Sequence, residues 1–276
     1  MKIYYSIILL TVFIVQNSYG QKAKNEPFSY DDEIEFYWKT ENDSLVLKAK
    51  NKLLIPIEII IRERKTNNEV QSMLLKAKDS ITIGSRVRNK PDTLIAKQFN
   101  KRLKIGYYYG HKSLISPDTT YQYRLPFQKG KKYAVSQGFR GKSSHSKTSS
   151  LYAIDFQLDI GEPVHAAREG LVVQVIDWYT EHGDRSFIKK ANKIVVLHSD
   201  GTIASYVHLD YKGSFVKIGE YITKGQKIGT SGLTGFTRGP HLHFVVRKER
   251  DIAIPIYFEG YKKKELKRRK LYKVKN

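Results

Sequence analysis

Short runs of apolar and β-branched residues, separated by polar turns, recur along most of the chain. In the first half, turn-like residues such as 41–43 separate runs that alternate in polarity or are continuously apolar. Runs of this length and spacing are typical of β-strands. They occupy residues 33–38, 44–49, 53–61, 73–75, 80–83, 103–109 and 121–125. The pattern predicts a small antiparallel β-sandwich over residues 21–128.

From residue 129 glycines stand at the ends of short runs. Runs of β type occupy residues 171–176, 193–198, 203–209 and 242–247. The sequence Ser199-Asp200-Gly201 is a strong tight-turn signal and predicts a hairpin between two of these runs. Residues 125–132 have the character of a hinge. We therefore predict an all-β protein, in which a compact antiparallel domain over residues 129–258 follows the sandwich-like domain.

The two ends of the chain differ from both domains. Lys2, an apolar run over residues 3–15 and small residues before Gln21 are typical of an export signal, so residues 1–20 are expected to be cleaved. The run is shorter than the roughly 20 residues of a membrane-spanning helix. Residues 259–276 are rich in lysine and arginine and are expected to form a basic tail, either a short helix or a frayed end. We expect an exported protein, periplasmic or extracellular.

Composition narrows the range of partners. The 276 residues suffice for two modest domains, and the absence of cysteine excludes a lipid-anchored lipoprotein. The net charge of +22 favours anionic partners. Export and the lack of an aromatic–basic repeat argue against nucleic acid. Solubility, together with a loose association with an anionic envelope surface, accounts for the charge.

Histidines and one aspartate supply the candidate chemistry. In residues 239–244, read as a strand, His241 and His243 share one face and Leu242 and Phe244 the other, an arrangement that suits a metal site but also arises by chance. Asp155 lies on the polar face of a second strand, where it requires solvent, a partner or a metal.

His208 ends the run 203–209, and strand alternation places it on the same face as Ala204 and Tyr206. A rim histidine is an equally good interpretation of this position. Asn192, just before the run 193–198, is expected to face the cleft and touch substrate. The remaining histidines of this half, His165, His182 and His198, are expected to be structural or to lie in loops.

Five ordered motifs, taken together, resemble one family. They are YAIDF (152–156), GEPVHAAREG (161–170), YVHL (206–209), KGQKIG (224–229) and GPHLHF (239–244). In this order they resemble the M23 peptidases, the LytM/lysostaphin-type zinc metallopeptidases that cut peptidoglycan cross-links. The resemblance covers about residues 130–250 and implies the compact antiparallel β-sheet of that family, of the duplicated hybrid motif type.

The resemblance implies a zinc ion (Zn2+) held by His145, Asp155 and His243, with water in the fourth position. Two histidines, one carboxylate and an open position are the donors of catalytic rather than structural zinc. The resemblance also implies that His208 and His241 orient the water, take its proton and stabilise the oxyanion.

One position departs from the family pattern. The family places a histidine four residues before the aspartate, where this chain has Leu151, and His145 lies ten residues before Asp155 in the Ser/Lys-rich segment 141–150. A loop can return its histidine over the strand end, and we expect His145 to be the first ligand. Without it, only Asp155 and His243 remain.

These observations favour a secreted zinc-dependent endopeptidase that hydrolyses peptide cross-links of peptidoglycan. The alternative is a catalytically inactive regulator of the same fold, or a peptidoglycan-binding protein, that activates another cell-wall hydrolase. The irregular spacing of His145 supports that alternative, and the presence of His208, His241 and His243 opposes it. A biotin- or lipoyl-carrier barrel would need an exposed Met-Lys-Met or Asp-Lys-Ala hairpin, which the chain lacks.

Overall fold

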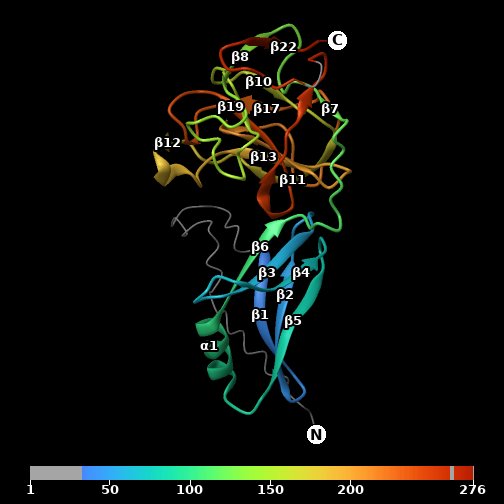
Figure 1. Cartoon of the computed structure of the whole chain (residues 1–276), viewed down its shortest axis with the longest axis vertical. Coiled ribbons are helices and arrows are strands. Elements are labelled where there is room, and N and C mark those ends of the chain that lie inside the picture. The colour runs from blue at the N-terminus through green and yellow to red at the C-terminus, as the bar shows by residue number, and fades with distance from the viewer. Residues whose placement is uncertain (1–32, 262–263, 276) are drawn as a thin grey trace. The chain divides into compact units, whose positions relative to one another are not determined.

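The computed structural model describes residues 33–261 and 264–275 (Figure 1). These residues form two compact units, which divide between residues 111 and 112. The predicted export signal lies outside the described residues. Among the residues that are described, no helix has the length and apolar character needed to cross a membrane.

The first unit contains two three-stranded antiparallel sheets, in the orders β1-β2-β5 and β4-β3-β6. Every residue from Ile57 to Ile61 is buried, so the central strand β3 is covered on both faces. The elements are β1 (Ile34–Glu41), β2 (Ser44–Asn51), β3 (Ile57–Glu63), β4 (Glu69–Leu75), β5 (Ser80–Val87), α1 (Asp92–Arg102) and β6 (Leu103–Tyr109). The predicted β-rich character of this unit is confirmed.

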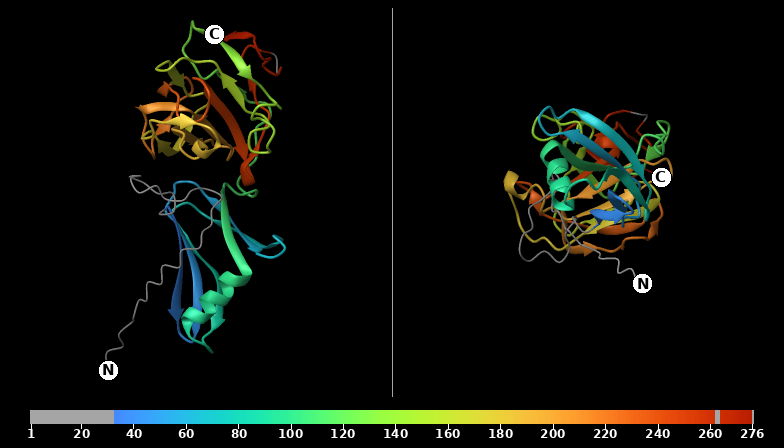
Figure 2. Two further views of the ribbon diagram at one scale, coloured as in Figure 1. Left: turned by 90° about the vertical axis from the view of Figure 1, so that its left-hand side faces the viewer. Right: turned by 90° about the horizontal axis from the view of Figure 1, so that it is seen from below.

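Helix α1 was not predicted from the sequence. Pro91 stands directly before it, Asp92 lies in its first turn and Arg102 in its last, which are recognised start and stop signals. The aromatic ring of Phe99 packs edge-on against Trp38 of β1, with 5.5 Å between ring centroids. The helix is visible beside the strands in Figure 2. Its few buried positions left too weak an apolar periodicity for the pattern to reveal it.

The second unit is built around one long sheet in the order β16-β11-β13-β14-β19-β9-β8-β22, with β20 paired to β19. A smaller sheet has the order β10-β17-β15, and two short pairs, β12-β18 and β21-β7, complete the unit. The strands are β7 (Gln122–Tyr123), β8 (Lys132–Gln137), β9 (Ile154–Phe156), β10 (Pro163–His165), β11 (Gly170–Ile176), β12 (His182–Gly183), β13 (Lys193–Leu197), β14 (Ile203–Val207), β15 (Leu209–Ser214), β16 (Tyr221–Ile222), β17 (Lys227–Ser231), β18 (Gly235–Phe236), β19 (Leu242–Lys248), β20 (Ile252–Ala253), β21 (Tyr257–Phe258) and β22 (Leu271–Lys273). Two single-turn 3₁₀ helices are η2 (Arg185–Phe187) and η3 (Glu249–Asp251).

One face of the central strands forms the core of the second unit. Ile154 and Phe156 of β9 and Phe244 of β19 are fully buried there, and the ring of Tyr206 on β14 packs against Phe244 at 4.9 Å. The predicted hairpin is present, since β13 and β14 pair on either side of Gly201, whose φ is +81°. The opposite face of these strands carries the polar residues of the candidate site.

Both predicted limits of the second domain need correction. The chain divides at 111/112 rather than at 128/129, because Tyr123 and Phe127 are buried in the core of the second unit and β7 pairs with β21. The described residues of the segment 259–276 form neither a helix nor a frayed tail. β22 pairs antiparallel with β8, and Leu266 and Tyr272 are buried, so this segment closes one edge of the sheet.

Candidate metal centre

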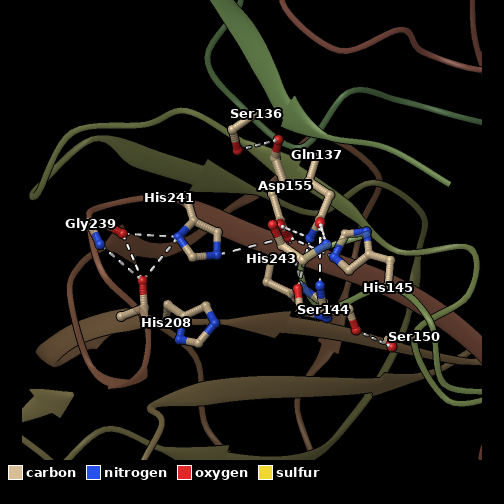
Figure 3. Close-up of polar contacts among 12 residues, drawn as sticks. Ser136, Gln137, Ser144, His145, Ser150, Asp155, His208, Gly239, His241 and His243 are labelled. Atoms are coloured by element: carbon tan, nitrogen blue, oxygen red, sulfur yellow. Dashed lines mark hydrogen bonds and ion pairs between the residues drawn. The ribbon is translucent and has the colours of Figure 1, made fainter. Parts of the chain in front are cut away.

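His145, Asp155 and His243 converge on one point (Figure 3). One potential ligand atom from each lies within 4.8 Å of the others. Asp155 Oδ1 is the shared centre, 3.2 Å from His145 Nε2 and 2.8 Å from His243 Nδ1. Two of the three residues are buried and His243 is half-buried. The three predicted metal ligands are therefore brought together in space.

Strand register explains how Asp155 and His243 meet. The two residues are direct cross-strand partners on β9 and β19, and side chains of partnered residues stand on the same face of a sheet. Their sequence neighbours Phe156 and Phe244 point to the apolar core. Sequence alternation predicted this arrangement for both residues.

His145 reaches the centre from the loop between β8 and β9. Its backbone N–H donates to Gly141 O at 3.0 Å, and its ring Nδ1 lies 2.9 Å from Gly138 O. A carbonyl can only accept, so Nδ1 carries the proton and Nε2 carries the lone pair. Nε2 is buried without a hydrogen bond. The loop thus presents a desolvated imidazole nitrogen to Asp155, despite the ten-residue spacing.

Gln137, at the end of β8, holds this loop against Asp155 and was missed by the sequence analysis. Its side-chain Nε2 donates to Asp155 Oδ2 at 3.0 Å and to Ser144 Oγ at 2.7 Å. Its Oε1 accepts from the backbone N–H of Ser143 at 2.9 Å. A Cβ at Gly141 would lie 2.2 Å from Gln137 Cγ, so the glycine is required for this packing. Gln137 belongs to no recognisable motif. Its cross-strand pairing with Asp155 is the feature that places it at the site.

His208 lies beside the same centre, but the predicted face was wrong. Tyr206 points into the core, whereas the His208 ring lies 4.6 Å from the ring of His241 and 6.0 Å from that of His243. The cause is the backbone of His208, whose φ of +65° is left-handed. Strand β14 ends at Val207, and the left-handed residue breaks the alternation that would have sent the imidazole into the core.

His208 and His241 are oriented in the same way. His208 Nδ1 lies 2.7 Å from Thr234 O, and His241 Nδ1 lies 3.0 Å from Gly239 O and 3.3 Å from Thr237 Oγ1. Each carbonyl fixes the proton on Nδ1 and leaves the lone pair on Nε2. His241 Nε2 lies 3.8 Å from Asp155 Oδ1, so its free nitrogen faces the metal centre.

Burial and the shared carboxylate set the charge states. Burial alone would raise the pKa of Asp155, but close contacts with His145 and His243 hold it well below its usual range. Burial, followed by the neighbouring His241 and His243, lowers the pKa of His208 to about 3. Burial also lowers the pKa of His243. At His145 the Asp155 carboxylate outweighs burial and raises the pKa, so a metal ion competes there with a proton.

Asn192 does not face substrate as predicted. Its side chain is fully buried; Nδ2 donates to Tyr179 O at 2.8 Å and to Asp210 O at 3.0 Å, and Oδ1 accepts from the N–H of Tyr179. Its own backbone N–H donates to the hydroxyl of Thr234, whose carbonyl orients His208. Asn192 is thus a structural support of the site.

The other histidines of this unit lie away from the ligand set. His165 Nδ1 lies 2.8 Å from Gly225 O, and His198 is buried with Nδ1 2.7 Å from Glu169 O. These contacts are structural. His182 is exposed on β12.

Residues 149–255, which lie within the second unit, match the sequence profile of peptidase family M23. His145 lies outside the matched segment. An uncharacterized metalloprotease of Buchnera aphidicola is 33% identical over 135 residues, 48% of this chain and 32% of its own length. Peptidoglycan DD-endopeptidase ShyA of Vibrio cholerae is 32% identical over 116 residues, 41% of this chain and 24% of the relative.

Lysostaphin of Staphylococcus simulans is 38% identical over 94 residues, 34% of this chain and 17% of its own. The solved catalytic domain of the S. simulans protein is 31% identical, with 47% of this chain and 88% of that chain covered and a TM-score of 0.33. The matched segments span less than a third of the length of the three curated relatives.

Proposed function

We propose that the protein is a zinc-dependent endopeptidase that hydrolyses peptide cross-links of peptidoglycan. The observation that carries the proposal is the meeting of His145, Asp155 and His243 beside His208 and His241, in the unit whose residues 149–255 match peptidase family M23. Relatives described as peptidoglycan endopeptidases, such as ShyA, support the choice of substrate.

The residues present fit a zinc ion. His145 Nε2 is a buried nitrogen without a hydrogen bond, although it lies 3.2 Å from Asp155 Oδ1, as expected of a nitrogen oriented as a ligand rather than as a donor. Two imidazoles and one carboxylate form the donor set of catalytic zinc, with a position left for water. The hydrogen bond from His145 Nδ1 to Gly138 O is the outer support that zinc-binding histidines usually have.

Zinc, when bound, supplies a Lewis acid that polarises the peptide carbonyl and lowers the pKa of a bound water to about 7. The chain's own residues supply the proton handling. His208 is a neutral imidazole at pH 7 with its lone pair on Nε2, so this nitrogen accepts a hydrogen bond from the attacking water and orients it. His241, with its proton fixed on Nδ1, presents Nε2 toward the centre, where it accepts the proton that the attacking water releases. The resulting imidazolium stabilises negative charge that develops on the carbonyl oxygen.

The setting of the reaction is part of the proposal. The export signal predicted over residues 1–20 puts the protein in the periplasm or outside the cell, where peptidoglycan lies. The net charge of +22 gives a loose attraction to an anionic envelope surface.

Digestion of purified peptidoglycan with and without a chelator tests the proposal. The protein lacking residues 1–20 should release soluble peptides, stop when the chelator is added, and recover when zinc is restored. Undigested peptidoglycan in the presence of zinc would refute the enzymatic assignment. Peptidoglycan that is bound but not cleaved would instead support an inactive regulator.

The His241→Ala variant separates metal binding from proton handling. It should retain about one zinc per chain, because His241 is not in the ligand set, and lose cleavage by a factor of about 100 or more, the scale of a general acid–base group. Elemental analysis and release of muropeptides measure the two properties. Full activity in this variant would remove His241 from the mechanism.

A further inference from the structure

A cavity of about 580 Å³ is lined in part by Thr237, which contacts His241. Its walls come from residues 182–185, which include β12 and the start of η2, and from residues 236–238 after β18. The volume lies within the range typical of small-ligand sites, about 300–1,000 Å³. None of the predicted catalytic or metal-binding residues lines it.

Thr237 is the wall that this cavity shares with the catalytic histidines. Its side chain is buried, and its hydroxyl donates to Gly239 O at 2.8 Å. The hydroxyl oxygen of Thr237 also lies 3.3 Å from His241 Nδ1. Thr237 therefore connects the wall of the cavity to the ring of His241.

The charge of the cavity is positive. Arg185 and Arg238 both line it and are exposed, and neither forms an ion pair with any residue in the described part of the chain. The only acidic residue in the wall is Asp184, whose Oδ1 already accepts from the backbone N–H of Ser186 at 2.9 Å and from its hydroxyl at 2.7 Å. Two guanidinium groups thus face the cavity with one carboxylate that is engaged elsewhere.

We propose that this cavity binds a free carboxylate of the substrate peptide through Arg185 and Arg238. A guanidinium presents paired N–H donors that match a carboxylate, and Phe236 offers an apolar wall to the adjoining aliphatic part of the same residue. The inference rests on the proposed function, because it takes the ligand to be a peptide of the cell wall. It adds that the enzyme selects peptides with an unmodified acidic group near the bond to be cut.

Binding to protein treated with a chelator tests the inference without cleavage. The probes are soluble cross-linked muropeptides, either untreated or with their carboxylates converted to amides by carbodiimide and ammonia. The untreated form should bind the wild type about tenfold more tightly in calorimetric titration, the scale of a hydrogen bond to a charged group. The double variant Arg185→Gln/Arg238→Gln should bind both forms with the affinity that the wild type has for the amide.

The double variant Lys131→Gln/Lys217→Gln is the matched control, since it removes the same charge from exposed positions outside the cavity. It should keep the tenfold preference. All of the substituted residues are exposed, so thermal denaturation should show wild-type folding.

Equal binding of the two probes by the wild type, a preference that survives in the Arg185/Arg238 variant, or no binding at all would overturn the inference. The proposed function fails separately, in the chelator experiment on whole peptidoglycan. A protein that cleaves without the preference refutes the carboxylate site alone. A protein that binds with the preference but never cleaves refutes the enzymatic assignment alone.

Discussion

Replacing Gln137 with methionine tests how the loop histidine is held at the metal centre. Methionine keeps the length and most of the volume of glutamine but removes its amide. The substitution deletes the hydrogen bonds from Nε2 to Asp155 Oδ2 and to Ser144 Oγ, and the one that Oε1 accepts from Ser143. Asp155 and His145 both remain, so a change in zinc affinity would come from their positioning.

The expected size follows from the lost contact with Asp155. A hydrogen bond to a charged group contributes about 1.5–3 kcal/mol, and 1.4 kcal/mol corresponds to a factor of ten in affinity. Zinc affinity should therefore fall about 10- to 100-fold, as is typical when a group that supports a metal ligand is removed. Freeing the loop that carries His145 adds to this effect.

Competition for zinc with a chelating dye near pH 7 measures the change. Gln157→Met is the matched control, because Gln157 is exposed one residue beyond β9 and should bind zinc as the wild type does. If Gln137→Met bound zinc within twofold of the wild type, the hydrogen bonds of Gln137 would not be what organises the ligands.

Three further substitutions test the ligand set and the fold. His145→Ala should lose most of the zinc found by elemental analysis, while His182→Ala retains it; full retention in the first variant would remove His145 from the centre. Burial alone would raise the pKa of Asp200, but hydrogen bonds hold it at about 2 against an ordinary value of 3.8. The ionised Asp200 therefore stabilises the folded state at pH values above the unfolded pKa, and this stabilisation is lost as pH falls toward 2. Asp200→Asn should therefore cost about 2 kcal/mol at pH 7 and flatten the pH dependence of urea unfolding between about 4 and 2, and an unchanged midpoint at pH 7 would contradict this. Tyr272→Ser should lower the free energy of unfolding by about 3 kcal/mol, because Tyr272 is buried. Leu271→Ser is the control and should leave it nearly unchanged, since Leu271 is 65% exposed on the same strand. Equal effects of the two substitutions would show that the C-terminal strand does not contribute to the core.

Sequence alternation located the parts of the site that lie within regular strands. Asp155 and His243 have apolar neighbours on both sides, so a period of two was enough to assign their common face. The same rule failed for His208, since one left-handed residue at the strand end reverses the direction of the side chain. Nothing in the periodicity of the run 203–209 signals that reversal.

Other features depend on contacts that no local pattern records. The loop of His145 is held by a side chain from β8, and the role of Gln137 depends on its pairing with Asp155, 18 residues away. The basic character of residues 259–276 concealed two apolar anchors, Leu266 and Tyr272, because single buried residues do not create a periodic signal. The limits predicted for the second domain differ from the observed ones because isolated buried residues, such as Tyr123 and Phe127 before it and Leu266 and Tyr272 after it, also create no periodic signal.

The main chain selects the tautomers of this centre. In His145, His208 and His241 alike, a backbone carbonyl accepts a hydrogen bond from Nδ1–H, so the identity of neighbouring side chains has little influence on which ring nitrogen is available. The tautomers should therefore tolerate substitution of the residues that supply these carbonyls. The arrangement is sensitive to the length of the segments that supply these carbonyls. Inserting or deleting one residue there would move the carbonyl away from Nδ1 and change the orientation of the imidazole, although every ligand and catalytic side chain is still present. For the orientation of these three rings, the length of the supporting segments therefore matters more than the side chains of the residues that supply the carbonyls.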